Sequence, residues 1–125
     1  MNIPGPYLLY LGDARDEISV KTSRGIAVFR PDLSLGEYRR STEAVTLGLR
    51  QMSFAEAVAE GAKTLVIGVA NAGGVLGPEA VADAVAALDA GLNVAAGLHD
   101  RLNANPEIRA AAERNGRQLF DVREP

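Results

Sequence analysis

The clearest pattern in this chain is a series of short apolar runs separated by more polar segments that end in glycine. Runs that suit strands lie at residues 7–11, 64–69, 93–97 and 118–122, and a fifth run at 26–29 ends at Arg30-Pro31. Short runs that are apolar on both faces are typical of buried strands in a parallel sheet. The chain is therefore predicted to build its core around parallel strands.

The segments between these runs carry helix signals of unequal strength. Ser53 and Glu56 have the spacing of a capping box, in which each residue satisfies an amide of the other. Pro78 suits the first position of a second helix, and Asn105 suits the cap of a third. Residues 14–23 are polar with scattered apolar positions, and they predict a helix or an irregular helical turn that stops at Gly25.

One unit recurs three times: a helix ends at glycine, two or three residues follow, and a strand begins. The glycines are Gly61, Gly91 and Gly116, which can take the left-handed conformation at a helix end. Strand–helix–strand units with short links imply parallel strands and right-handed crossovers. The prediction is one α/β domain over residues 1–125, a Rossmann-like, doubly wound and mainly parallel sheet of about five strands. Residues 32–52 lack a clear period and are expected to form an irregular excursion, either functional or flexible.

Composition narrows the function class. The net charge is −3 and the pI is about 5.1, so no basic surplus points to nucleic acid or an anionic membrane as a partner. Cysteine is absent, which excludes disulfides, thiolate catalysis and zinc–thiolate sites. No apolar stretch approaches the roughly 20 residues that span a bilayer. The N-terminus lacks the basic and apolar regions of a signal peptide, so a cytoplasmic location is expected.

Candidate functional residues collect after the strands, where open α/β sheets bind small-molecule ligands. At the strand ends and within the helical segment 14–23 these candidates are Gly12, Asp13, Lys21, Thr22, Asn71, Gly73, Gly74, His99, Asp121 and Arg123. The glycine loop at residues 71–78 would expose backbone amides to an anion. A tight strand-to-helix turn explains the same glycines equally well. The spacing is neither G-x-G-x-x-G nor that of a P-loop.

His99 is the only histidine and would suit a general acid/base or a hydrogen-bond donor. Taken alone, a surface or capping histidine beside Asp100 is the more common case. With one histidine and no cysteine, no metal site is expected. No G-x-S-x-G elbow supports a hydrolase triad.

Five charged or polar residues also have both a functional and a structural interpretation. Asp13 would bind a ligand hydroxyl or ammonium group, but capping of the next helix is favoured. Lys21-Thr22 would hold an anion, although an exposed lysine on a polar helix is the usual case. Arg39-Arg40 would attract a carboxylate or phosphate, and a solvated pair of charges is favoured instead.

Several sequence blocks occur together in order. They are residues 11–14, Lys21-Thr22 with Gly25-Ile26, Arg30-Pro31, residues 64–75, residues 96–99 with Leu102, and residues 121–123. Together they resemble the N-terminal domain of the D-glutamate N-acetyltransferase family, formerly a domain of unknown function. The resemblance runs from Tyr7 to Pro125, with a poor match over residues 32–46.

This resemblance implies a Rossmann-like domain followed by a larger C-terminal domain that contains a P-loop. It implies acetyl transfer from acetyl-CoA to the amine of D-glutamate, in bacterial D-amino-acid catabolism. The chain ends at Glu124-Pro125, where the family continues, so the P-loop domain is not part of this sequence. An apolar face left by that partner domain would predict self-association, and hence a homo-oligomer.

Within this resemblance, His99 is a candidate to accept the amine proton, and the amides of Gly73 and Gly74 are candidates for holding an oxyanion or phosphate. Lys21 or an arginine would pair with a substrate carboxylate. The alternative is a non-catalytic module that binds nucleotide or CoA, or that only docks. An NAD-dependent oxidoreductase has fold analogy alone in its favour, and the missing G-x-G-x-x-G fingerprint counts against it.

Overall fold

A computed structural model describes residues 3–68, 77–97 and 101–122, and these residues form a five-stranded sheet. The strands are β1 (Tyr7–Gly12), β2 (Ser34–Arg39), β3 (Thr64–Ile67), β4 (Asn93–Ala96) and β5 (Leu119–Asp121). They lie in the order β2-β1-β3-β4-β5, and each pairing is parallel. The predicted Rossmann-like α/β fold with a parallel sheet of five strands is confirmed.

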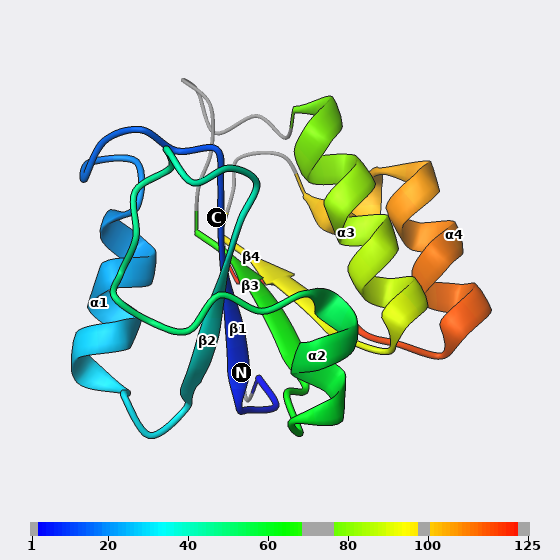
Figure 1. The fold of residues 1–125 in the computed structure, drawn as a ribbon. Coiled ribbons are helices and arrows are strands. Elements are labelled where there is room, and N and C mark those ends of the chain that lie inside the picture. Colours follow the sequence, from blue (N-terminus) through cyan, green and yellow to red (C-terminus); the bar gives the residue numbers. More distant parts are fainter. Residues whose placement is uncertain (1–2, 69–76, 98–100, 123–125) are drawn as a thin grey trace.

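The helices cover the two faces of the sheet unequally. They are α1 (Lys21–Phe29), α2 (Phe54–Ala59), α3 (Pro78–Ala90), the 3-10 helix η1 (Leu102–Ala104) and α4 (Pro106–Asn115). Figure 1 shows α1 on one side of the sheet and α3 and α4 on the other, with α2 packed beside α3. The larger core lies on the α3 side and includes Leu8, Leu65, Leu88, Val94 and Ile108. None of the helices in the described ranges is long and apolar enough to span a membrane.

The local signals of the second half of the chain are confirmed. The Ser53 hydroxyl accepts the Glu56 amide at 3.1 Å, and the Glu56 carboxylate accepts the Ser53 amide at 2.8 Å, which completes the capping box of α2. The Asn105 side chain accepts the amide of Ile108 at 3.0 Å and caps α4. Gly91 and Gly116 end α3 and α4 with φ of 111° and 62°. These short-range contacts are the ones that sequence spacing encodes.

The predicted strand at residues 26–29 is wrong, because these residues form the last turn of α1. The β-branched and aromatic side chains there suggested a strand, yet Val28 and Phe29 are 62% and 81% exposed. Gly25 lies inside the helix, at the modest cost of about 0.5–1 kcal/mol that glycine adds to a helix. A crossover helix is what joins two parallel neighbours such as β1 and β2, so topology outweighs local preference here.

The predicted irregular excursion at residues 32–52 is wrong for its first part, which contains β2, and right for residues 40–52. Gly36 and Glu37 hid the strand, because neither residue gives the apolar alternation of a half-buried strand. A Cβ on Gly36 would stand 2.5 Å from the Met52 sulfur and 2.8 Å from the Arg50 carbonyl oxygen. Glycine is therefore needed where the returning chain crosses β2.

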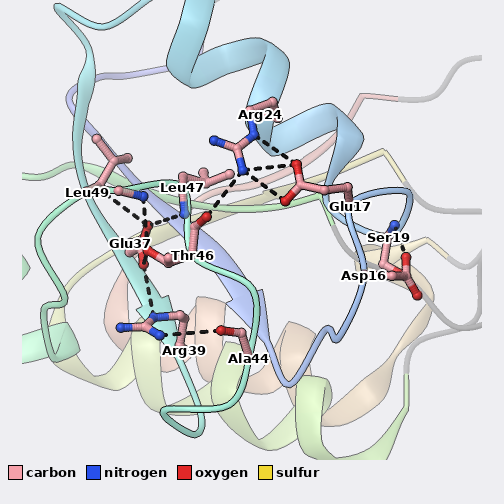
Figure 2. Close-up of polar contacts among 11 residues, drawn as sticks. Asp16, Glu17, Ser19, Arg24, Glu37, Arg39, Ala44, Thr46, Leu47 and Leu49 are labelled. Atoms are coloured by element: carbon pink, nitrogen blue, oxygen red, sulfur yellow. Dashed lines mark hydrogen bonds and ion pairs between the residues drawn. The ribbon is translucent and has the colours of Figure 1, made fainter.

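Residues 40–52 have little regular structure, but a buried carboxylate fixes their path. Glu37 has no exposed surface. Its carboxylate accepts the Thr46 hydroxyl at 2.5 Å and the amides of Leu47 and Leu49 at 2.8 and 3.2 Å. The Arg39 Nε lies 3.0 Å from the same carboxylate, and Figure 2 shows these groups converging on it. The segment is ordered by hydrogen bonds to one buried carboxylate instead of by a helix or a strand.

Candidate functional site

The strand order places a topological switch point between β1 and β3. From β1 the chain moves to β2 on one side, and it later returns to place β3 on the other side. In open α/β sheets, ligands bind at the carboxyl ends of the strands beside such a point. Gly12 ends β1, Gly68 follows β3, and α1 begins next to them. This edge is the candidate functional site.

Gly12 has a backbone role at this edge. Its φ is +57°, a conformation that L side chains rarely adopt, and its carbonyl oxygen accepts the Arg40 amide at 2.8 Å. A Cβ at this position would lie 3.1 Å from the Tyr10 ring. The glycine lets β1 turn sharply away at the switch point.

The N-terminal turn of α1 differs from those of α2, α3 and α4. Its cap residue, Val20, offers no side-chain hydrogen bond, and the first turn holds no acidic residue. Lys21 and Thr22 are exposed in that turn, so the expectation of an exposed lysine is confirmed. By contrast, α2, α3 and α4 each carry a glutamate in the first turn. The positive end of α1 therefore lacks the negative groups that usually stabilise it.

Ser23 lies in the same turn and is fully buried. Its hydroxyl has no hydrogen-bond partner in the part of the chain that the structure describes. A Cβ built on Gly68 would stand 2.6 Å from the Ser23 hydroxyl oxygen and 3.2 Å from the Ser23 amide nitrogen. The hydroxyl and the amide of Ser23 thus pack closely against the end of β3, where only glycine fits.

Arg24 connects α1 to the segment that follows β2. Arg24 donates to both carboxylate oxygens of Glu17 at 3.0 Å, and also to the Thr46 carbonyl oxygen at 3.2 Å. The Thr46 hydroxyl in turn donates to the buried Glu37, as Figure 2 shows. These contacts fix the first turns of α1 against the segment held by Glu37.

The Asp13 side chain does not cap α1, so that favoured interpretation is wrong. Its carboxylate accepts Arg15 Nε at 3.0 Å and the Ser41 hydroxyl at 3.1 Å. Arg15 also pairs with Glu43 at 2.8 Å. The eight residues between Gly12 and Lys21 put Asp13 too early in the chain to reach the start of the helix. Asp13 instead fastens the loop after β1 to the segment after β2.

A second polar cluster lies on the α3 side of the same edge. The Tyr10 hydroxyl donates to Asp83 at 2.5 Å, and Arg40 donates to the same carboxylate oxygen at 2.6 Å. Arg40 also pairs with Glu79 at 3.1 Å. Burial, together with the hydrogen bond to Asp83, raises the pKa of Tyr10 well above its ordinary value. The hydrogen bond that Arg40 donates to Asp83 also raises the pKa of Arg40.

The expectation of a solvated Arg39-Arg40 pair is therefore wrong for Arg39, which is only partly exposed, whereas Arg40 is exposed as expected. Each arginine neutralises a buried carboxylate, Glu37 for Arg39 and Asp83 for Arg40. Glu37 and Asp83 are charged residues that sequence alone would place at the surface, yet both are buried. Arg39 and Arg40, at the end of β2, thus act as counter-ions for these two carboxylates.

Asp121 lies at the same edge but away from the switch point. Its carboxylate accepts the amides of Leu102 and Asn103 at 2.6 and 3.2 Å and thereby holds η1. With β3 and β4 between β5 and β1, the strand spacing separates it from Gly12 by about 14 Å. The structure thus brings Gly12, Lys21 and Thr22 to one place and leaves Asp121 apart.

The remaining sequence candidates fall outside the described residues. They are Asn71, Gly73, Gly74, His99 and Arg123. Among the residues that are described, no group of three or more His, Asp or Glu side chains gathers to hold a metal ion. The site is therefore described from β1, α1 and Gly68.

Sequence reasoning missed Ser23 and Gly68. Ser23 reads as one more polar residue in a polar segment, and Gly68 as an unremarked residue within the third apolar run. The signal that links them is the β1–β3 pairing, which joins parts of the chain far apart in sequence. Only the assembled sheet shows that the two residues meet.

Two curated proteins are similar to this chain along its whole length. The D-glutamate N-acetyltransferase of Tritonibacter scottomollicae is 47% identical over 98% of the chain, and that of a Pseudoalteromonas species is 39% identical over 100%. The chain spans only 37% and 38% of the length of these relatives. The predicted resemblance to one domain of that family of longer proteins is thus confirmed.

A solved structure and a family profile agree with this assignment. The crystal structure of a DUF1611 family protein from Anabaena variabilis superposes with a TM-score of 0.73 at 22% identity, over 94% of this chain and 36% of that one. The likeness to that structure shows a common fold. The profile of DUF1611_N, described as a Rossmann-like domain of unknown function, matches residues 37–125. The chain belongs to the DUF1611_N family of Rossmann-like domains.

Proposed function

We propose that this chain supplies part of the substrate- and anion-binding site of an acetyl-CoA-dependent D-glutamate N-acetyltransferase. The observation that carries the proposal is the uncapped N-terminal turn of α1, with Lys21 in it, at the switch point of the sheet. The names of the two curated relatives supply the reaction. Both substrates are anionic, since glutamate carries carboxylates and CoA carries phosphates.

The chemistry of acetyl transfer sets what the site must do. The amine nitrogen, without its extra proton, attacks the thioester carbonyl, an oxyanion forms, and the CoA thiolate leaves as the amide bond forms. The amine proton passes to a base, and the thiolate takes up a proton. Binding must orient the amine and the thioester, and positive groups must hold the anionic parts of the substrates.

We assign the binding of anionic substrate groups to the α1 turn. Lys21 offers an ammonium group without a carboxylate partner among the described residues. Gly12 and Thr22 lie at the same edge of the sheet and complete this part of the proposed site, with Asp13 beside them. His99 stays in the proposal as the base, and Asn71, Gly73, Gly74, Asp121 and Arg123 as further contacts, all on their sequence positions after strands.

The domain that would complete the enzyme is the P-loop domain that the family resemblance implies. The relatives are more than twice as long as this chain, which leaves room for such a domain in them. In this arrangement the Rossmann-like domain binds substrate groups at its edge, and the second domain supplies the rest of the site. Acetyl-CoA is the proposed acyl donor.

The test is acetylation of D-glutamate by this chain with acetyl-CoA, followed as release of the free CoA thiol. L-Glutamate and omission of the amino acid are the controls. Turnover that requires D-glutamate and falls in Lys21→Met, but not in Lys63→Met, supports the proposal. Lys63 is a matched control because it is exposed and lies before β3, at the opposite edge of the sheet.

The second candidate function is a binding module without chemistry of its own. The observation that favours it is the exposed, uncapped first turn of α1, which would bind an anionic group whether or not this chain carries catalytic groups. The same assay separates the two functions. Absence of turnover by a folded chain that still binds CoA or nucleotide would support the module and contradict catalysis by this chain alone.

A further inference from the structure

We propose that the solvent-facing side of α1 is a docking surface for the additional part of the chain that the longer relatives contain. The α1 docking surface is defined by Lys21, Gly25, Val28 and Phe29, which follow one another at helical spacing, and its occupant is a further domain of the same polypeptide. The inference rests on the length of the relatives and not on the acetylation reaction, so it goes beyond the proposed function.

The outer side of α1 is apolar where a helix surface is usually polar. Ser23 is fully buried and marks the side that faces the sheet, whereas Val28 and Phe29 are exposed. Ile18, in the turn directly before the helix, is 86% exposed. Val122 is the one other large apolar side chain that stands exposed in the described ranges. Single exposed apolar residues are common, but a group of them on one element is typical of an interaction surface.

Gly25 gives a second, independent reason to place a partner here. Glycine in the interior of a helix destabilises it, and its usual justifications are a left-handed backbone or a lack of space. Neither applies to Gly25, because its φ lies outside the left-handed region and a Cβ built on it meets no atom within 4 Å. Glycine also lets another backbone approach closely. A docked chain at this point of α1 would account for it.

The sheet also needs more cover on the side where α1 lies. Figure 1 shows α3 and α4 on the opposite side, with α2 packed beside α3. Leu65 and Leu119 belong to the core under α3. Because side chains alternate along a strand, Val66 and Phe120 point toward the α1 side, and both are only partly buried. Parallel sheets are almost always covered on both faces, which favours further chain on this side.

The length of the relatives identifies the occupant. This chain spans 37% and 38% of the curated relatives and 36% of the Anabaena variabilis chain, so each of them has a larger body of chain besides this domain. A stable dimer buries about 800 Å² on each partner, and the side chains of Ile18, Val28 and Phe29 fall short of that area. A domain on the same chain needs less area, because the tether gives it a high effective concentration. The α1 docking surface therefore fits a tethered domain better than a second copy.

Docking here would place the additional domain beside the proposed binding site. Lys21 begins the α1 docking surface and also offers its ammonium group to substrate anions in the proposed function. Ligand sites occur preferentially where two domains meet. The docked domain would thus bring its own groups to the edge of the sheet at which β1 ends.

The experiment measures how fast a thiol at position 28 reacts, because this chain has no cysteine of its own. Val28→Cys is labelled with iodoacetamide, and the modified peptide is quantified by mass spectrometry. The isolated chain is compared with a fusion in which it replaces the matched region of the Tritonibacter scottomollicae relative. We expect labelling to be slower by about tenfold or more in the fusion, because docking removes the thiol from solvent. Glu113→Cys, on the exposed face of α4, is the control and should react equally fast in both proteins.

Gly25→Ala gives a second readout, the midpoint of thermal unfolding. The substitution should raise the midpoint of the isolated chain, where the new methyl group meets open space. It should lower the midpoint of the fusion, where the docked chain fills that space. A rise of the same size in both proteins contradicts the proposal.

Equal labelling rates at position 28 in the isolated chain and in the fusion overturn the proposal. So does labelling of the isolated chain that slows with protein concentration while sedimentation shows a dimer, because the occupant is then a second copy. If the fusion does not fold, the intact relative with cysteine at the position aligned with Val28 takes its place, and rapid labelling there overturns the proposal in the same way. Labelling needs no substrate, so loss of the acetylation hypothesis leaves this result standing.

Discussion

In residues 53–122, each α-helix starts at a polar cap or a proline, and α3 and α4 end at a left-handed glycine. In residues 7–52, α1 has no side-chain cap, and the backbone after β2 follows buried carboxylates and arginines. The second half is ordered by contacts within a few residues, and the first half by contacts between distant ones. Most of the candidate site comes from the first half, where local rules are broken.

The largest expected effect comes from removing the charge that organises residues 40–52. Glu37→Gln leaves Arg39 without its counter-ion and weakens the acceptor for the amides of Leu47 and Leu49. We expect a loss of about 3 kcal/mol or more in the free energy of unfolding, as for other broken buried pairs. Urea denaturation measures it. Glu113→Gln, on the exposed face of α4, is the control and should change stability by less than about 0.5 kcal/mol.

A smaller loss is expected from Gly36→Ala, because the new methyl group would collide with Met52 and the Arg50 carbonyl. Overpacking of this kind costs about 1–3 kcal/mol. The same substitution at Gly25 of α1 meets open space and should stabilise the helix by about 0.5–1 kcal/mol. Thermal unfolding of the two variants should therefore shift in opposite directions. If Gly36→Ala is as stable as the wild type, Arg50 and Met52 must move aside at little cost in free energy.

The capped helices of the second half predict moderate and independent losses. Ser53→Ala and Asn105→Ala should each lower the free energy of unfolding by about 1 kcal/mol, because each removes one side-chain cap. The two caps share no partner, so the double variant should lose the sum. Coupling between the two, measured by denaturant titration, would contradict the local character of this half.

The Ser53 amide lowers the pKa of Glu56, which gives the cap a pH dependence. A carboxyl whose pKa is lower in the folded state stabilises the fold above its ordinary pKa, and this stabilisation is lost as pH falls through the lowered value. The difference between Glu56→Gln and the wild type should therefore shrink in acid, because protonation removes the same charge from the wild type. A difference that stays constant across this pH range would show that the Glu56 carboxylate does not stabilise the start of α2.

At neutral pH the smallest effect belongs to Tyr10, whose raised pKa matters only in alkali. The unfolded chain ionises its tyrosines near pH 10, while folded Tyr10 keeps its proton. Its contribution to stability is therefore complete below that pH and is lost as pH rises above it. Phenolate absorbance should show one of the three tyrosines ionising only with unfolding. Tyr10→Phe should remove this late ionisation. If the late ionisation persists in the variant, it belongs to another tyrosine.

The comparison also explains how far sequence reasoning reached. Ser53, Asn105 and the glycine helix ends were predictable, because their partners lie three or four residues away. The strand at residues 34–39 was missed because Glu37 looks like a surface residue until Arg39 and the amides of residues 46–49 are folded around it. Ser23 was missed because burial beneath the β3 end depends on Gly68, far along the chain. The edge of the sheet was foreseen as the site, but not its uncapped helix.

The position of β1 has a consequence for the order in which the chain assembles during synthesis. Of the five strands of this sheet, β1 leaves the ribosome first, and it is an inner strand with β2 on one side and β3 on the other. Its apolar residues Leu8, Leu9 and Leu11 are fully buried in the finished protein, yet β3 is made much later. Until then β1 has only β2 as a neighbour, and its other edge stays open. An unpaired apolar strand is prone to aggregation, so the interval before β3 emerges is when nascent chains most need protection by chaperones.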